Sequence, residues 1–198
     1  MAKMMDPKFK QSRRLGLNVS GHPKANKRLN KGLGRDDRKL TEYGRQLLEK
    51  QRLRAYYGVN EKQMRKYFVQ ATKSDRSVTT GDALVRQLEM RLDNLTYRAG
   101  FASSIRQARQ MVVHGHILVD GKRIDIPSYQ VKPGQVLELR EKSRSNEMFK
   151  ENFESQFAQA LPYLSKKEGF KCELARVPDR EEVPIEITDS LIVEFYSR

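Results

Sequence analysis

The sequence predicts an α+β protein. A mainly helical domain carries an inserted small α/β module, in which short helices pack on a small, mostly antiparallel sheet. Two observations predict this class. Apolar residues recur at helical spacing in the N-terminal half, as at Met64, Phe68 and Ala71. The dipeptide Asp120-Gly121 separates two short apolar runs, which is typical of a two-residue β-hairpin turn. The sheet therefore follows the first helices along the chain.

The first 40 residues have little apolar periodicity and are rich in basic residues. Such a segment is typical of a disordered basic arm. The alternative, which we favour, is an arm that orders against phosphate groups, because bound phosphates neutralise its self-repulsion. Arg13 and Arg14 support this interpretation, since the apolar residues Leu15 and Leu17 stand beside them as anchors.

Two helices are predicted next. Residues 40–57 form the first, because leucine and tyrosine side chains share one face, and Gly58 ends it. The second begins after Asn60, a favoured N-cap residue, with Gln63 three residues on. Its core-facing stripe has the spacing i, i+3, i+4, i+7 and consists of Met64, Tyr67, Phe68 and Ala71.

A further helix is predicted to start at Thr79, because Asp82 stands three residues later as in a capping box. Its leucine stripe runs toward Gly100 and consists of Leu84, Leu88, Leu92 and Leu95. We therefore expect one continuous helix across this stretch.

The module begins with a short helix that presents arginines. Ser104 and Gln107 form a capping box at its start, and Gly115 stands where the chain can take a left-handed turn. Its apolar face consists of Ile105, Ala108 and Val112. After the Asp120-Gly121 hairpin, a turn at Pro133-Gly134 leads into a strand candidate at residues 136–140.

The remaining chain is predicted to hold a helix, a strand and an apolar end. Phe149, Phe153 and Phe157 are spaced by four, residues 170–174 alternate like a strand, and residues 191–196 are apolar enough to dock. We expect this segment to fold back onto the N-terminal helices. The expected domains are a basic helical domain at 1–90, the module at 91–153 and the C-terminal segment at 154–198.

The charge of the chain indicates a polyanionic partner. The net charge is +14, from 39 basic and 25 acidic residues. Residues 1–70 hold 19 basic and 6 acidic side chains, whereas residues 146–198 hold 7 basic and 11 acidic ones. We therefore expect the polyanion to contact the N-terminal third and the module, and the acidic segment to have another role.

Signals for catalysis and cofactors are weak in this sequence. The single cysteine, Cys172, excludes an internal disulfide and a cysteine-clustered zinc site, and its alternating pattern predicts a strand core residue. His114 and His116 are expected to pack in a turn or to touch a phosphate. We find no catalytic motif, and no carboxylate pair in an apolar run where its pKa would be raised for acid–base work, so we expect no enzyme, metal or cofactor.

Membrane insertion and secretion are not expected either. The N-terminus lacks the apolar segment of a secretory signal, and the chain has no run of about eighteen apolar residues. We therefore expect no membrane partner and no small-molecule substrate.

Several stretches resemble one family. Residues 106–110 and 114–121 resemble the RNA-binding module named after the fourth small-subunit ribosomal protein. The flanking stretches that resemble this bacterial or organellar family are residues 12–16, 39–44, 49–54, 91–95, 126–129, 131–135 and 191–198. Some members carry a cysteine-clustered zinc site near residues 22–38, and this chain resembles a zinc-free variant.

The resemblance implies a primary binder of small-subunit rRNA that joins a multi-helix junction early in assembly. It also implies contact with neighbouring small-subunit proteins, the fifth among them, and a contribution to translational accuracy. The implied location is the ribosome, in the cytoplasm or the equivalent organelle compartment. An RNA-modifying enzyme and a free-standing stress protein that uses the same module are the alternatives.

The residues expected to bind RNA are mainly arginines and lysines, because the planar guanidinium matches phosphate. In the N-terminal part they are Arg13, Arg14, Lys27, Arg28, Arg35, Arg38, Lys39, Arg45, Arg52, Arg54, Arg65 and Lys66. In the module they are Ser103, Ser104, Arg106, Arg109 and Lys122. We expect Arg106 and Arg109 to form one arginine face near a helix start.

Overall fold

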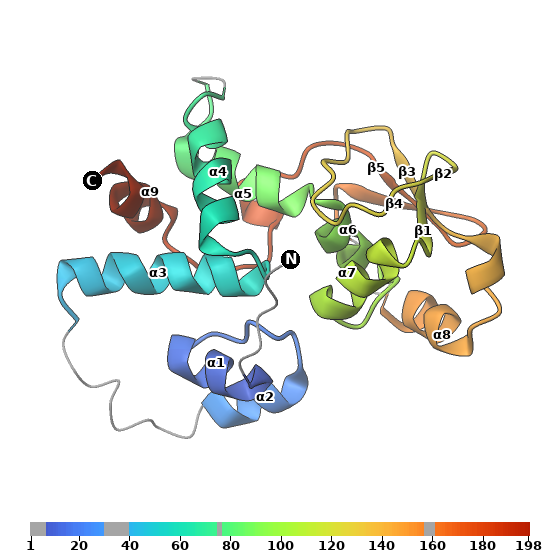
Figure 1. Cartoon of the computed structure of the whole chain (residues 1–198), viewed down its shortest axis with the longest axis horizontal. Helices are drawn as coiled ribbons and strands as arrows, with labels where there is room; N and C mark the ends of the chain where they lie inside the picture. Colours follow the sequence, from blue (N-terminus) through green and yellow to red (C-terminus); the bar gives the residue numbers. More distant parts are fainter. Residues whose placement is uncertain (1–6, 30–39, 75–76, 157–160) are drawn as a thin grey trace. The chain divides into compact units, whose positions relative to one another are not determined.

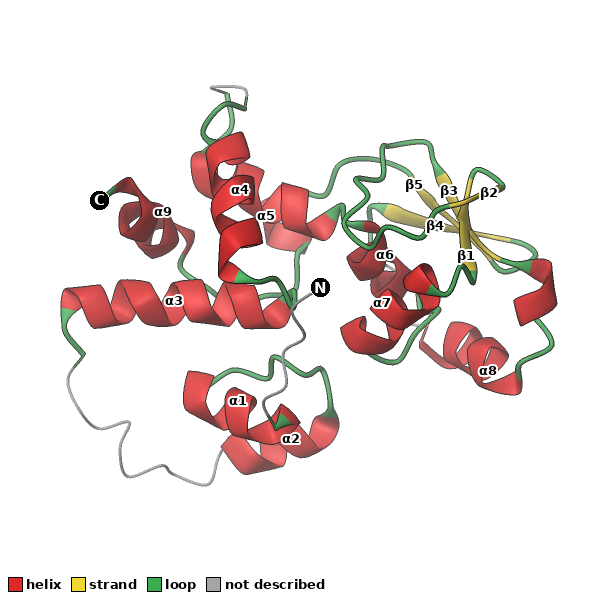
Figure 2. Ribbon diagram, viewed as in Figure 1, coloured by secondary structure: helices red, strands yellow, loops and turns green. Residues whose placement is uncertain are grey.

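A computed structural model describes residues 7–29, 40–74, 77–156 and 161–198 of the chain. The chain folds as two compact units (Figure 1). The helical unit comprises Met1–Leu84 and Ile185–Arg198, and the sheet unit comprises Val85–Pro184. Helices dominate the first unit and a five-stranded sheet lies in the second (Figure 2), which confirms the predicted α+β class.

The helical unit is built from the two ends of the chain. Its helices are α1 (Lys8–Leu15), α2 (Pro23–Leu29), α3 (Glu42–Tyr56), α4 (Glu61–Ala71) and α9 (Asp189–Ser197). The Thr41 side chain caps α3 by accepting from the Gly44 N–H at 3.1 Å. The predicted cap of α4 is confirmed, because Asn60 Oδ1 accepts from the Gln63 N–H at 2.8 Å. All four residues of the predicted α4 stripe are buried.

The end of the chain packs on α3 and α4. Ile192 of α9 is 1% exposed, and the Tyr196 ring stacks on Phe68 with centroids 4.9 Å apart. The Tyr196 hydroxyl donates to Glu61 Oε1 at 2.8 Å, and Glu61 Oε2 also pairs with Lys50 Nζ at 3.0 Å. Two segments far apart in the sequence therefore share one core.

This Glu61 cluster predicts a pH-dependent contribution to stability. Burial by itself raises the pKa of Glu61, but hydrogen bonds from Lys50 and Tyr196 and the charges of Lys50 and Arg54 lower it overall. A carboxyl whose pKa is lowered on folding stabilises above its unfolded pKa, and that stabilisation is lost as the pH falls through its folded pKa.

We therefore expect Glu61→Gln to destabilise the protein by about 1 kcal/mol or less at neutral pH, since the site is partly exposed. The difference in stability from wild type should shrink as the pH falls below 4.5, the ordinary pKa of a glutamate side chain. Thermal melts of both proteins between pH 7 and pH 3 measure this. A difference that stays constant over that range would contradict the predicted contribution.

The sheet unit contains an antiparallel sheet whose strand order is β2-β1-β3-β5-β4. Its strands are β1 (Ile117–Val119), β2 (Lys122–Arg123), β3 (Val136–Leu139), β4 (Leu164–Lys167) and β5 (Lys171–Leu174). Its helices are α6 (Leu92–Arg98), α7 (Ile105–Val113) and α8 (Glu147–Gln156), with short 3₁₀ turns at Glu141–Ser143 and Arg180–Glu182. A further helix, α5 (Thr80–Glu89), begins in the helical unit and ends in the sheet unit.

The predicted hairpin turn is confirmed. Asp120 and Gly121 both have positive φ, 49° and 73°, as a two-residue turn of this type requires. The Asp120 carboxylate also accepts from the Val136 N–H at 2.9 Å and from Gln135 Nε2 at 2.7 Å. The backbone of Asp120 thus forms part of the β1–β2 turn, and its side chain holds the start of β3.

The single long helix expected through the leucine stripe is wrong, because the chain forms α5 and α6 with a break at residues 90–91. The Leu92 N–H donates to the Tyr129 carbonyl at 2.8 Å, and the Asp93 N–H donates to the Pro127 carbonyl at 3.1 Å. The backbone groups at the break therefore bond to a distant loop in place of a preceding helical turn.

The division of the C-terminal segment also differs from the expected ranges. Only residues 185–198 belong to the helical unit, whereas residues 154–184 lie in the sheet unit. The physical reason is strand pairing, since β5 pairs with β3 and places Cys172 opposite Leu137. The sheet therefore needs strands from both sides of α8.

The core of the sheet unit confirms the interpretation of Cys172. Its side chain is fully buried, and burial raises the pKa of the thiol to about 12. The predicted phenylalanine helix is α8, in which Phe153 stacks on Phe101 with centroids 4.9 Å apart. Phe157, predicted for the same stripe, lies outside the described residues.

Candidate nucleic-acid interface

Exposed basic side chains line the outer faces of the helical unit. The helices turn most of their apolar residues toward the core, which leaves many of their charged residues in solvent, although Glu49 and Lys50 of α3 are buried. Of the basic residues predicted to bind RNA, those exposed in this unit are Arg13, Arg14, Lys27, Arg45, Arg65 and Lys66. Exposed cations on several helices are suited to contact a phosphate backbone.

Two predicted arginines of α3 have partners within the protein. Arg52 Nε donates to the Leu15 carbonyl at 2.7 Å, and its Nη1 pairs with Glu49 Oε1 at 2.7 Å. Arg52 therefore ties α1 to α3. Arg54 Nη1 pairs with Glu61 Oε2 at 3.1 Å. Both arginines are partly buried, so they offer less of their charge to a ligand than the exposed residues do.

Four predicted residues fall outside what the structure describes. Arg35, Arg38, Lys39 and the side chain of Arg28 lie outside its described part. Their assignment as RNA ligands stays a prediction.

In the sheet unit, α7 presents the predicted arginine face. Arg106 is exposed, whereas the Arg109 side chain is 30% exposed and pairs with Asp93 Oδ2 at 2.7 Å. The cap of α7 is confirmed in one half, because Ser104 Oγ accepts from the Gln107 N–H at 3.3 Å. The Gln107 carboxamide oxygen instead accepts from the N–H and hydroxyl of Ser103, at 2.8 and 2.7 Å. Ser104 therefore caps the first turn of α7, and Ser103 fixes the position of the Gln107 side chain.

Two buried carboxylates of the sheet unit pair with arginines, and one of them, Asp93, holds Arg109. Asp93 is fully buried and accepts from Arg91 at 2.9 Å (Nε) and 2.7 Å (Nη2), in addition to Arg109. Glu89 is also fully buried and accepts from Arg98 Nε at 2.6 Å and from the Tyr163 hydroxyl at 2.7 Å. Both carboxylates therefore form ion pairs with arginines.

The burial of these two carboxylates could have been predicted from the sequence. Each directly follows a leucine of the apolar stripe, Leu88 or Leu92, which places it beside the core. Their partners are arginines, so the pair orients cations and is not arranged for proton transfer.

The β1–β2 hairpin adds basic side chains beside α7. Lys122 and Arg123 are both exposed. Gly115 ends α7 with φ of 71°, and a Cβ there would clash with the Arg123 side chain. The glycine therefore lets Arg123, which sequence reasoning missed, lie against the turn after α7.

The two histidines of this turn differ in burial, because His114 is exposed and His116 is partly buried. His116 Nδ1 lies 2.8 Å from Ser143 Oγ, and its ring meets Phe149 edge-to-face. Burial, followed by the charges of His114 and Arg140, lowers the pKa of His116. Within the described ranges, no three histidine, cysteine or acidic residues are grouped so that they could hold a metal ion. None of the helices in those ranges is long and apolar enough to cross a membrane.

Comparison with known proteins extends over the whole chain. The family model of the ribosomal protein S4/S9 N-terminal domain matches residues 3–89, and that of the S4 domain matches residues 90–137. The chain is 73% identical over 198 residues to small ribosomal subunit protein uS4 of Finegoldia magna, with 100% of both chains covered. It is 51% identical over 199 residues to protein uS4B of Clostridium acetobutylicum, again with 100% of both covered.

A third relative, protein uS4 of a Geobacillus species, is 50% identical over 204 residues with 100% of both chains covered. These matches confirm the family resemblance seen in residues 106–110 and 114–121. The chain belongs to the ribosomal protein S4 family, whose members named here are small-subunit ribosomal proteins and not enzymes.

Proposed function

We propose that this chain is a structural component of the small ribosomal subunit that binds small-subunit rRNA directly and early in assembly. The observation that carries the proposal is the set of exposed basic side chains on α1, α2, α4 and α7, which the folded core does not use. Structured RNA is recognised largely through its backbone and shape, which such a surface suits. Membership of the ribosomal protein S4 family supports the same function.

The acidic C-terminal segment supports a second kind of contact. Residues 146–198 hold 7 basic and 11 acidic side chains, which makes them poor ligands for RNA. We propose that they contact a neighbouring small-subunit protein, the fifth, and that this contact contributes to translational accuracy. The place of action is the ribosome, in the cytoplasm or the equivalent organelle compartment.

The arginine face gives a direct test of RNA binding. Arg106→Ala should weaken binding to a 5′-region fragment of small-subunit rRNA, because an exposed cation near a helix start is lost. The slope of log K against log salt should fall by roughly 0.7–0.9 for each lost phosphate contact. Filter-binding titrations at several salt concentrations measure both quantities.

The matched control is Lys150→Ala, which removes one exposed cation from α8, a helix in the acidic segment. It should leave the slope unchanged. Arg109→Ala is a less clean test, because it also removes the ion pair with Asp93. An Arg106→Ala slope equal to that of wild type would show that α7 does not contact phosphate.

If the chain were a free-standing stress protein, its association with small subunits would differ. A structural component should remain stoichiometric on small subunits after a high-salt wash, as measured by sucrose-gradient sedimentation. Release of the chain from mature subunits under mild salt would favour the stress protein.

A further inference from the structure

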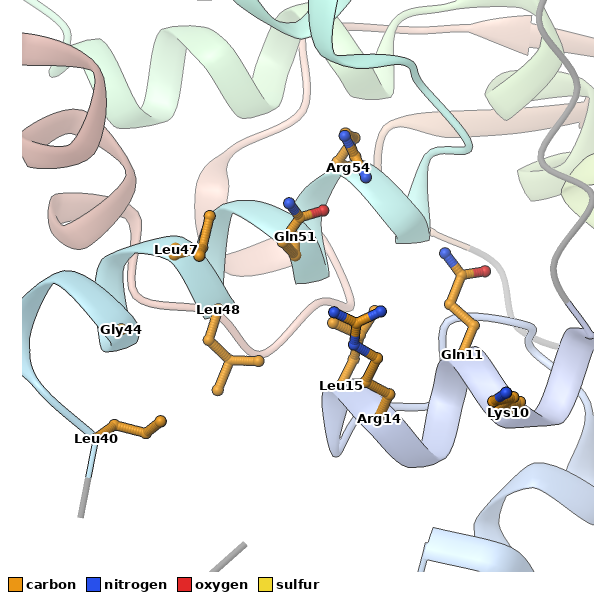
Figure 3. Close-up of a pocket in the computed structure, with 10 residues that line it drawn as sticks. All are labelled: Lys10, Gln11, Arg14, Leu15, Leu40, Gly44, Leu47, Leu48, Gln51 and Arg54. Atoms are coloured by element: carbon orange, nitrogen blue, oxygen red, sulfur yellow. The ribbon is translucent and has the colours of Figure 1, made fainter. Parts of the chain in front are cut away.

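The region between α1 and α3 of the helical unit is hollowed into a cavity of about 540 Å³. Its lining combines the apolar side chains of Leu15, Leu40 and Leu48 with the polar side chains of Gln11 and Arg14. In Figure 3, Leu48 extends from α3 toward α1, and it packs against the small apolar cluster that contains Leu15. The cavity therefore has apolar walls beside polar groups.

The rim of this cavity is cationic. Lys10 and Arg14 of α1 and Arg54 of α3 all line it, and none of its ten described lining residues is acidic. Leu40 stands at the edge and is 49% exposed. A ligand that suits these walls must therefore bring both an apolar surface and negative charge.

We propose that this cavity receives one unpaired nucleotide of the bound RNA, with its base against Leu40 and Leu48 and its phosphate at Arg14. The inference rests on the proposed RNA-binding function. An unpaired nucleotide joins a flat base, which offers a largely apolar face, to an anionic phosphate. The carboxamide of Gln11 has the donor and acceptor groups that a base edge requires. The volume falls in the range of about 300–1,000 Å³ that is usual for small-ligand sites.

Charge complementarity favours RNA over a protein segment at this place. An apolar side chain from a neighbouring protein would cover Leu40 and Leu48, but it would bring no counter-charge for Lys10 and Arg14; Arg54 is already paired with Glu61. A nucleotide satisfies the walls and the rim together.

The test compares two exposed aliphatic side chains of the helical unit. Leu40→Ala removes apolar surface at the cavity, and Val69→Ala is the matched control, because Val69 is 45% exposed on α4 and does not line the cavity. We expect Leu40→Ala to raise the Kd for the 5′-region rRNA fragment by about three- to tenfold, through lost apolar contact. The salt slope should not change, since no cation is removed. Val69→Ala should bind like wild type.

A photoreactive benzoylphenylalanine at position 40 then locates the nucleotide in reconstituted small subunits. We expect a crosslink to one unpaired nucleotide. An abasic substitution there should weaken binding by wild type, but should add little to the loss in Leu40→Ala. Three outcomes would overturn the inference: a Leu40→Ala Kd equal to that of wild type, a crosslink only to paired nucleotides, or a crosslink only to protein. Failure of wild type to bind the fragment would instead refute the proposed function.

Discussion

Asp93→Ala should lower the free energy of unfolding by about 3–5 kcal/mol, the loss typical of breaking a buried ion pair from one side. Asp93 is 0% exposed and Arg91 is 2% exposed. The substitution removes a carboxylate that accepts hydrogen bonds from two N–H groups of Arg91. The same carboxylate also accepts from Arg109. A buried guanidinium then loses its counter-charge in a region with little access to water.

Denaturant melts of the purified chain measure this loss. The matched control is Glu138→Ala, which breaks the more exposed pairs of Glu138 with Arg144 and Lys171 in the same unit. Its cost should be about 1 kcal/mol or less for each pair, because solvent screens both of them. A loss of under 1 kcal/mol for Asp93→Ala would show that Arg91 finds an equivalent partner, and the predicted role of Asp93 would be wrong.

A second variant separates charge from packing. Replacing the pair together, as Arg91→Met with Asp93→Leu, should recover part of the lost stability, since no buried charge then lacks a partner. The double variant still loses the carboxylate that holds Arg109, so its RNA affinity should stay below that of wild type. Full recovery of both properties would show that Asp93 does not position Arg109.

Local chemistry explains which parts of the fold were predictable. The cap at Asn60 and the turn at Asp120-Gly121 depend on residues within a few positions of each other. The break between α5 and α6 could not be predicted in this way, because the Leu92 N–H bonds to Tyr129, which is far along the chain. Strand pairing across α8 is equally non-local.

The residue types of the candidate interface could be predicted from the sequence. Which of these residues are exposed and which are paired within the protein could not. Arg106 and Arg109 are equivalent in the sequence pattern, yet only Arg109 pairs with a buried carboxylate. Likewise, Arg52 of α3 bonds to the Leu15 carbonyl, while Arg45 of the same helix is exposed. Tertiary contacts decide which cation is left for RNA.

Truncation before Leu191 should lower the free energy of unfolding by several kcal/mol, because α9 supplies part of the core of the helical unit. Burying one large apolar side chain stabilises by about 1.5–3 kcal/mol, and Ile192 alone is 1% exposed. The truncation also removes the stack of Tyr196 on Phe68 and the Tyr196–Glu61 hydrogen bond. A domain with about 5–15 kcal/mol of stability then comes close to unfolding.

Polar contacts across the same junction add to the loss. Gln46 Nε2 donates to Glu194 Oε2 at 2.9 Å, and Lys50 Nζ lies 4.4 Å from the centroid of the Phe195 ring. Without α9, Gln46 and Lys50 keep buried polar groups that have lost these partners. Thermal and denaturant melts of the truncated chain should therefore show a lower midpoint.

Two point variants give the truncation its controls. Ser197→Ala changes an exposed residue whose hydroxyl bonds only within α9, to the Val193 carbonyl, and it should leave the melt nearly unchanged. Tyr196→Phe keeps the ring stack and removes the bond to Glu61, at a cost of about 1 kcal/mol. The still-folded fraction of the truncated chain should keep most of its rRNA affinity, because the exposed cations of α1, α2, α4 and α7 remain. A truncated chain that melts like wild type but loses rRNA binding would show that α9 belongs to the RNA interface and not to the core.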